Sequence, residues 1–402
     1  MNFSIERVFA VPGLGAYYNE DLLALQQHPV SPSQRYTTPA HTPGMRHLRQ
    51  VAEVLSLGLQ LADGGVFWGD ALGVSYAGKS GREGVFRANP TQAGVLFERS
   101  SELGKGFKED CATLAQWGVS RALGFGISQA LLRAHASVSG TCMTSFLCKE
   151  YSLALPSDRV ELHGSCGYDW NDNVDKMVFY RLASLPAGQG DDLPNRVGQR
   201  GEKLLEYVSW LKSRVALQKD YTPVFHFDFH GGLDLVFERN RNQVIEYLCQ
   251  LATACLPFKL RVESPLHAAN REQMLQAYRE LHEALEGVSL ELVADEWANT
   301  AEDVQVFAES GAVDMIHIKM PDLGSLDNTV RAIQVCQKNG VGSLLGGSCV
   351  ETFVSSTIAV PIALALRPTL LMAKSGMGVN EAVSSAHNEM GRELALLQSP
   401  CE

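Results

Sequence analysis

The 402-residue sequence lacks a long uninterrupted apolar run. Its most apolar stretch, 358–372, is broken by two prolines and an arginine, whereas a membrane-spanning helix needs roughly 18 or more apolar residues. The N-terminus also lacks a basic segment followed by an apolar one, because acidic residues interrupt it. This composition argues against a secretory signal peptide. We therefore expect a cytoplasmic protein with no membrane partner.

Cysteine motifs are also absent. The 9 cysteines are scattered and odd in number, and no two form a Cys-x-x-Cys pair. This usage is typical of a reducing compartment, where cysteines act as small apolar residues.

Runs of positive charge are missing as well. The chain has 34 Lys and Arg against 45 Asp and Glu, for a net charge of -11. Nucleic-acid binding normally needs a basic face, so we expect no nucleic-acid partner.

The first part of the chain has no regular rhythm. Short strands are predicted over 8–11 and 65–72, and helices over 114–134 and 143–154, with glycine-rich connections between them. We interpret residues 1–155 as an α+β domain.

Residues 156–402 alternate between strand and helix signals. Strands are predicted over 223–229, 259–263, 290–295, 314–320 and 342–345, and helices over 201–217, 242–255, 271–285, 301–310 and 328–338. Parallel βα units have this spacing. Five units in succession favour an α/β fold of the TIM-barrel type, with an open doubly wound sheet as the alternative.

Charged residues stand at the ends of four consecutive strands: Asp228, Glu263, Asp295 and Lys319. In a barrel these ends share the face where active sites are built. Taken singly, an acidic residue at a strand end is usually a helix cap or a partner of a nearby arginine. Together, three buried carboxylates repel one another unless a cation neutralises them.

A divalent cation would compensate these acids better than one lysine can. Ligation by oxygen alone suits Mg²⁺, and Mn²⁺ is an alternative. Lys319, desolvated and near positive charge, would have a lowered pKa. It could then remove a proton from a carbon next to a carboxylate, while the cation stabilises the developing negative charge.

A long, ordered set of motifs resembles those of the methylaspartate ammonia-lyases, which are members of the enolase superfamily. The matching stretches are NDNVDKM (171–177), GEKLLEYVSWLKSRV (201–215), FHFD (225–228), LRVESP (260–265), ELVADEWANT (291–300), IKMPDLG (318–324), GGSCVET (346–352), AKSGMGVNE (373–381) and NEMGRELALL (388–397), with a weaker one at SYAGKSGRE (75–83). The resemblance implies an enolase-like modified TIM barrel under an N-terminal capping domain, a homodimer and bound Mg²⁺. It also implies removal of ammonia from a 3-substituted aspartate, as in the conversion of 3-methylaspartate to mesaconate.

The same resemblance assigns roles to individual residues. The three strand-end acids fall on the family's metal ligands, and Lys319 falls on its base for the (S)-configured C3 proton. Ser348 and Cys349 fall on a Thr-Cys pair that holds a substrate carboxylate.

Other positions depart from the family pattern. Ala187 replaces a second base, a histidine, while Ser165, His317 and Ser75 replace glutamines that contact substrate. Direct hydrogen bonds to a substrate decide discrimination strongly, so the exact substrate stays open, and a lyase or epimerase acting on another amino acid or carboxylate is the alternative. We hypothesise an enzyme with one base, in which His317 contacts the metal-bound carboxylate; otherwise His317 is a neutral histidine bonded to a backbone carbonyl.

One motif favours a different function. Residues 73–80, GVSYAGKS, match the P-loop pattern of NTPases. A P-loop must open a helix, and the glycines and proline over 81–90 are poor helix formers. A P-loop NTPase is therefore an alternative that depends on a helix after residue 80.

Two histidines flank the first acid of the site, in the stretch HFDFH. Alternation puts His226 and His230 on its side of the strand, so a metal site that includes histidine is conceivable. We expect instead that His226 packs below the acids and that His230 lies in the following loop.

Overall fold

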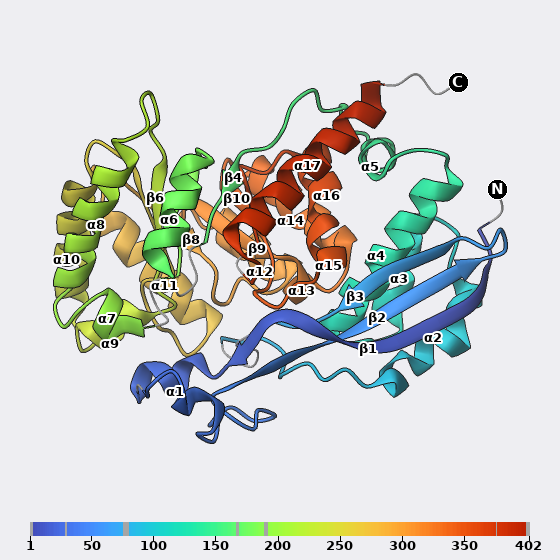
Figure 1. The fold of residues 1–402 in the computed structure, drawn as a ribbon, viewed down its shortest axis with the longest axis horizontal. Coiled ribbons are helices and arrows are strands. Elements are labelled where there is room, and N and C mark those ends of the chain that lie inside the picture. Colours follow the sequence, from blue (N-terminus) through green and yellow to red (C-terminus); the bar gives the residue numbers. More distant parts are fainter. Residues whose placement is uncertain are drawn as a thin grey trace.

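The computed structural model describes residues 3–28, 30–74, 80–165, 169–188, 192–374 and 376–398. Within these residues, a three-stranded antiparallel sheet is followed by a closed barrel of eight parallel strands (Figure 1). The sheet and its helices lie against one side of the barrel, as Figure 1 shows. The prediction of a barrel with an N-terminal α+β cap is confirmed, and the open sheet is excluded.

The N-terminal sheet consists of long strands in the order β1-β2-β3. The predicted strand at 8–11 is only the centre of a longer one, and the second strand was not predicted. The strands are β1 (Ile5–Glu20), β2 (Arg49–Leu61) and β3 (Val66–Ala71).

Helix α4 (Arg121–Val138) packs very closely on β3. A Cβ atom at Gly69 would lie 2.0 Å from the Gly126 carbonyl oxygen, so only glycine permits this approach. The single helix predicted over 114–134 is wrong: α3 (Phe107–Gln116) ends first, Gly118 takes a φ of +66°, and the Ser120 side chain caps α4. The other N-terminal helices are α1 (Leu22–Gln27), η1 (Gln34–Tyr36), η2 (Pro90–Ala93), α2 (Gly94–Arg99), η3 (Ser100–Glu102) and α5 (Met143–Glu150).

The barrel closes in the order β10-β11-β4-β5-β6-β7-β8-β9. The five strands predicted from the sequence are confirmed as β6 (Val224–Asp228), β7 (Leu260–Glu263), β8 (Leu290–Ala294), β9 (Met315–Lys319) and β10 (Gly342–Gly346). Three others were not predicted because they are only two or three residues long: β4 (Leu162–His163), β5 (Ser184–Leu185) and β11 (Leu370–Met372).

Helices surround the barrel strands. Thr300 is the N-cap of α12 and forms a capping box with Asp303. The helices are α6 (Trp170–Phe179), α7 (Leu193–Arg196), α8 (Glu202–Val215), α9 (Gly232–Val236), α10 (Arg241–Cys255), α11 (Arg271–Ala284), α12 (Ala301–Glu309), α13 (Met320–Leu323), α14 (Leu326–Lys338), α15 (Phe353–Thr357), α16 (Ala359–Leu366) and α17 (Val379–Gln398).

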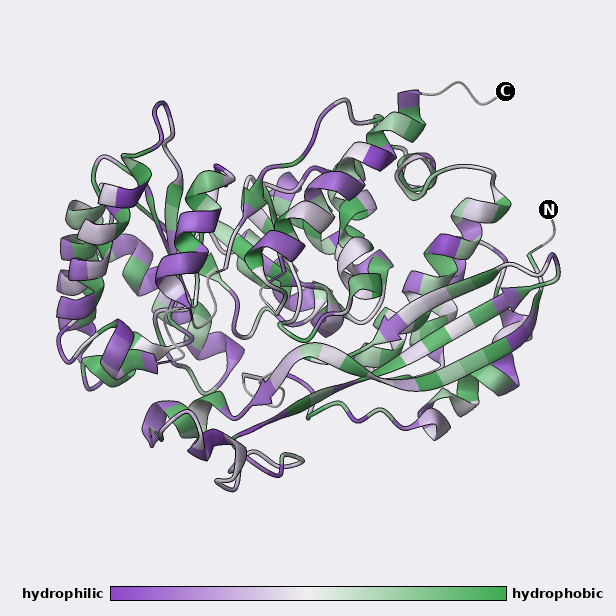
Figure 2. Cartoon of the chain, in the orientation of Figure 1, coloured by the Kyte–Doolittle hydropathy of each residue, from purple (hydrophilic) through white to green (hydrophobic). Residues whose placement is uncertain are grey.

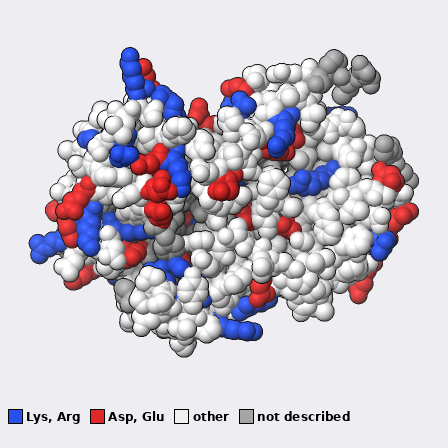
Figure 3. Space-filling model, viewed as in Figure 1, with Lys and Arg blue, Asp and Glu red and all other residues white. Residues whose placement is uncertain are grey.

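Hydropathy differs between the inner strands of the barrel and the helices around them. The barrel strands are mostly apolar, whereas the outer helices carry hydrophilic and hydrophobic residues together (Figure 2). Acidic and basic side chains are interspersed on the face shown in Figure 3. No helix in the described part of the chain has the length and apolarity needed to cross a membrane.

The register of the barrel strands aligns the polar residues at their carboxyl ends. Asp228 pairs with Glu263 between β6 and β7, and Lys319 pairs with Gly346 between β9 and β10. Asp295 directly follows the last residue of β8. All four predicted charged residues therefore lie at the same mouth of the barrel.

Candidate active site

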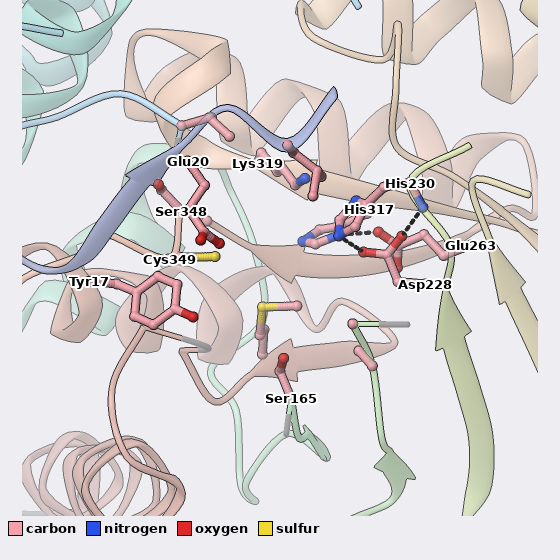
Figure 4. Close-up of a pocket in the computed structure, with 16 residues that line it drawn as sticks. Tyr17, Glu20, Ser165, Asp228, His230, Glu263, His317, Lys319, Ser348 and Cys349 are labelled. Atoms are coloured by element: carbon pink, nitrogen blue, oxygen red, sulfur yellow. Dashed lines mark hydrogen bonds and ion pairs between the residues drawn. The ribbon is translucent and has the colours of Figure 1, made fainter. Parts of the chain in front are cut away.

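A cavity at this mouth takes residues from both parts of the protein. Tyr17 and Glu20 come from the end of β1, and the remaining polar lining comes from the barrel strands and the segments that directly follow them (Figure 4). The barrel contributes Ser165, Asp228, His230, Glu263, His317, Lys319, Ser348 and Cys349. Seven of the eight predicted site residues therefore line the cavity, and the eighth, Asp295, lies beside it, bonded to Lys319.

The backbone turns sharply after three of these strands. His230, Ser264 and Trp297 follow β6, β7 and β8, and each has a positive φ, between 46° and 70°. Non-glycine residues rarely adopt this conformation, which often marks functional sites. Each of these residues comes one or two positions after an acid of the site.

Glu263 is held by two histidines. Its Oε2 lies 2.7 Å from His226 Nε2, and its Oε1 lies 2.7 Å from His317 Nδ1. Burial alone would raise the pKa of Glu263, but the two imidazoles outweigh burial and hold it well below the usual value. His317 Nδ1 therefore bonds to a carboxylate, which contradicts the alternative of a backbone carbonyl partner, and contact of His317 with a metal-bound substrate carboxylate stays a prediction. The interpretation of His226 as a residue beneath the acids agrees with its contact.

Asp295 is bonded to two cationic side chains. Lys319 Nζ lies 2.5 Å from its Oδ2, and Arg82 of the cap lies 2.9 Å from its Oδ1. Burial lowers the pKa of Lys319, but the attraction of Asp295 and nearby glutamates raises it more, and the net shift is upward. The nearest charged partner of Lys319 is thus a carboxylate, and the lowered pKa expected beside a bound cation stays a prediction.

Asp228 lies among other acids. Burial and the charges of Glu263, Glu296 and Asp295 raise its pKa well above the usual value, against a smaller lowering by His230. His230 Nε2 lies 3.2 Å from Asp228 Oδ2, and its Nδ1 lies 3.6 Å from Glu296 Oε1. His230 lies in the loop after β6, as expected.

Two clusters in the described residues could hold a metal ion. One combines Glu263, Asp295 and His317; the other combines His230, Asp295 and Glu296; the ligand atoms in each lie within 4.8 Å of one another. Asp228 belongs to neither cluster, so the structure does not bring the three predicted ligands together as one compact set. The donors nevertheless fit a dication, because buried carboxylates dominate, and burial together with the neighbouring acids raises the pKa of Asp228.

The predicted substrate-binding pair lies opposite the acids. Ser348 and Cys349 line the side of the cavity across from Glu263, and Ser165 lies across from Lys319 (Figure 4). The Ser348 amide donates to Glu351 Oε1 at 3.3 Å, and its hydroxyl accepts the Val350 amide at 3.3 Å. The hydroxyl hydrogen of Ser348 is thus left for another acceptor.

Glu296 and Arg82 were missed by the sequence interpretation. Glu296 could have been noticed, because it directly follows Asp295 in the sequence, and the structure shows that both are buried. Arg82 gives no local signal, because its partners Asp295 and Asp322 lie 213 and 240 residues away in the sequence.

The structure lacks the helix that a P-loop requires directly after residue 80. Residues 80–89 form no helix or strand, and the next element is η2. Motif residues 75–79, which include the family departure at Ser75, lie outside the described residues.

This combination of fold and site defines a class of enzyme. A closed barrel with acids and a lysine on consecutive strand ends, beneath a separate cap, is the architecture of the enolase superfamily. The fold is shared with the muconate lactonizing enzyme of Pseudomonas putida, with a TM-score of 0.63 at 15% identity over 95% of this chain and 88% of that one.

Closer relatives give the family. The model for the methylaspartate ammonia-lyase N-terminus matches residues 3–152, and the model for its C-terminus matches residues 154–399. The chain therefore belongs to the methylaspartate ammonia-lyase family.

Two solved structures of that family resemble this chain over its whole length. The Mg complex of β-methylaspartase from Clostridium tetanomorphum is 34% identical, with a TM-score of 0.85 over 99% of both chains. The Citrobacter amalonaticus methylaspartate ammonia lyase containing (2S,3S)-3-methylaspartic acid is 31% identical, with a TM-score of 0.90 over 99% of this chain and 100% of that one.

Proposed function

We propose that the protein removes ammonia from a 3-substituted aspartate, such as 3-methylaspartate, in a reaction that depends on Mg²⁺, with Mn²⁺ as a possible substitute. The observation that carries the proposal is the contact between Lys319 and Asp295 inside a buried cluster of acids. The family relatives, one of them a Mg complex and another containing 3-methylaspartic acid, support the same reaction.

Each residue then has a role in the proposed reaction. Glu263, Asp295 and Asp228 would hold the cation, which supplies charge stabilisation for the substrate carboxylate next to the reacting carbon. Lys319 takes the proton from C3, the C2–N bond breaks, ammonia leaves, and a C2–C3 double bond forms. Sharing of Asp295 with a dication would weaken the pull of that carboxylate on the Lys319 amine, as a general base requires.

The remaining cavity residues would orient the substrate. Ser348 and Cys349 would bind its second carboxylate, partly through the free hydroxyl hydrogen of Ser348. His317, bonded through Nδ1 to Glu263, would contact the substrate near the cation, and Ser165 would line the opposite side.

A substrate panel tests the proposal. Purified protein with Mg²⁺ would be incubated with both diastereomers of 3-methylaspartate, with larger 3-alkylaspartates and with aspartate. We expect release of ammonia together with absorbance of the unsaturated diacid for at least one 3-substituted aspartate, and both should be about a thousandfold slower with the variant Lys319→Met. No ammonia from any member of the panel, with either Mg²⁺ or Mn²⁺, would contradict the proposal.

A second candidate is an epimerase or lyase that acts on a different amino acid or carboxylate. It is favoured by the small residues Ala187 and Ser165 in the cavity lining, since the substrate contacts there differ from those implied by the family pattern. Proton exchange without loss of ammonia would distinguish it.

We also propose a division of the chain into a capping domain over 1–155 and a barrel domain over 156–402. The segment between α5 and β4, which forms no helix or strand, supports this boundary. A homodimer in the cytoplasm stays a prediction, which light scattering and cell fractionation can test.

A further inference from the structure

One cap arginine reaches into the barrel mouth. The Arg82 side chain is 1% exposed, and its guanidinium bonds to two acids of the barrel. Its terminal nitrogen lies 2.9 Å from Asp295 Oδ1, and its Nε lies 2.7 Å from Asp322 Oδ2. A planar guanidinium can bond to two carboxylates in a fixed geometry, whereas a lysine ammonium acts as a single point charge.

The backbone around Arg82 is seated on the same part of the barrel. Asn299 Nδ2 donates to the Ser80 carbonyl at 2.5 Å. Gly81 has a φ of +78°, and a Cβ there would lie 2.7 Å from the Trp297 ring. The segment is therefore fitted against the loop after β8, and Arg82 enters the mouth from a defined backbone position.

Both acids bonded to Arg82 are linked to Lys319. Asp295 ends the β8 side and bonds to Lys319 through its other oxygen, Oδ2. Asp322 lies in α13, three residues after Lys319 on the same segment. One guanidinium thus joins the end of β8 to α13, which directly follows β9, and Lys319 is the last residue of β9.

We propose that Arg82 is a positioning residue: by bonding to Asp295 and Asp322 together, it sets where Lys319 lies relative to the acids. The inference rests on the proposed function, in which Lys319 is the base. Arg82 does not touch the reacting atoms in this proposal; it acts through the two carboxylates. A misplacement of about 1 Å at a reacting group can cost about 100-fold in rate.

The first test compares Arg82→Lys with a matched control, Arg87→Lys. Arg87 is also a cap arginine bonded to a carboxylate, that of Glu53, but its side chain is 37% exposed and lies outside the cavity lining. We expect Arg82→Lys to lower kcat by about 100-fold, with KM and the Mg²⁺ dissociation constant within a few-fold of wild type. Arg87→Lys should leave all three unchanged.

The second test does not need turnover. Amide hydrogen exchange over 315–323, the segment that carries Lys319 and Asp322, should be faster in Arg82→Lys than in wild type and unchanged in Arg87→Lys. If the wild type converts no substrate, the proposed function fails, and this exchange measurement alone decides the role of Arg82.

A double-mutant cycle tests the path through Asp322. Asp322→Asn should lose part of the activity, and Arg82→Lys combined with Asp322→Asn should be no worse than Arg82→Lys alone. Turnover of Arg82→Lys within threefold of wild type, unchanged exchange over 315–323, or losses that add fully in the double variant would each overturn the inference. A parallel fall in Tm and Mg²⁺ affinity that accounts for the lost activity would also overturn it, since it would show a role in folding only.

Discussion

Lys319 Nζ lies 2.5 Å from Asp295 Oδ2, and this contact joins the ends of β9 and β8 inside the barrel mouth. Both side chains are almost fully buried, at 6% and 1% exposed. A buried ion pair of this kind contributes little net stability compared with apolar packing. We therefore attribute this buried ion pair, which lies beside other buried acids, to the chemistry of the site rather than to stabilisation of the fold.

Replacement of Lys319 tests its assignment as the base. Lys319→Met should lower kcat by about a thousandfold, the middle of the range for general base catalysis. Folding should survive, because Arg82 still bonds to Asp295. The measurements are ammonia release and Tm. Lys259→Met is the matched control, since that lysine is 71% exposed at its side chain; equal activity of the two variants would refute the assignment.

Removal of divalent cations tests the metal proposal. Chelation should abolish turnover, and Mg²⁺ should restore it, because the buried acids repel one another without a cation. Magnesium at 100 times its dissociation constant should also raise the free energy of unfolding by about 2.7 kcal/mol. Calorimetry would measure this stabilisation, which Glu263→Gln should largely remove. Full activity after exhaustive chelation would contradict the proposal.

Loss of the His317 imidazole should weaken the metal site. His317 Nδ1 is one of two donors to Glu263, and loss of such a supporting contact typically costs 10- to 100-fold in metal affinity. His317→Leu should therefore raise the Mg²⁺ dissociation constant about 10-fold or more, as measured by titration calorimetry. His317→Gln keeps a donor and should preserve metal affinity while changing KM. Unchanged affinity in the leucine variant would exclude this role.

Gly346 offers an independent way to move the same imidazole. A methyl group at this position would lie 1.9 Å from His317 Nε2, so the ring would have to shift. Gly346→Ala should therefore lower kcat/KM about 10-fold or more, by analogy with other losses of support around metal sites. Gly84→Ala is the control, since no atom lies within 4 Å of a Cβ built there. Similar kinetics for the two variants would show that the imidazole is not needed in its observed position.

Ala187 tests the hypothesis of a single base. With Lys319 on one face and alanine where the family has a histidine, the protein should exchange the C3 proton of one substrate diastereomer and leave the other nearly untouched. Proton NMR in deuterated water would follow both. Ala187→His should increase exchange of the slower diastereomer. Rapid exchange of both by the wild type would exclude the single-base hypothesis.

Much of the barrel was predictable because its signals are local. The strands β6 to β10 are mostly apolar segments bounded by turn residues. The start of α12 is marked by Thr300, whose capping contacts are with a residue three positions away in the sequence. By contrast, β4 and β5 are only two residues long and carry too little pattern to be recognised. Their strand character depends on pairing with neighbours that are distant in the sequence.

The candidate site divides in the same way. Asp228, Glu263, Asp295 and Lys319 could be found because each ends a recognisable strand, and the parallel βα rhythm implies that such ends converge. Two other features could not be predicted: the hydrogen bonds of two histidines to Glu263, and the absence of Asp228 from the two clusters that could hold a metal ion. Both depend on the directions of side chains, which the spacing of residues does not specify.

The sequence by itself determined the order of the βα units, the family and the four charged residues at the barrel mouth, since these depend on periodicity and motif. Only the tertiary structure decided the partners of those charges, including the upward direction of the Lys319 pKa shift and the arrival of Arg82 from the cap. The physical reason is that electrostatic energies depend on distance and burial in three dimensions, and residues 213 positions apart in the chain can be bonded neighbours.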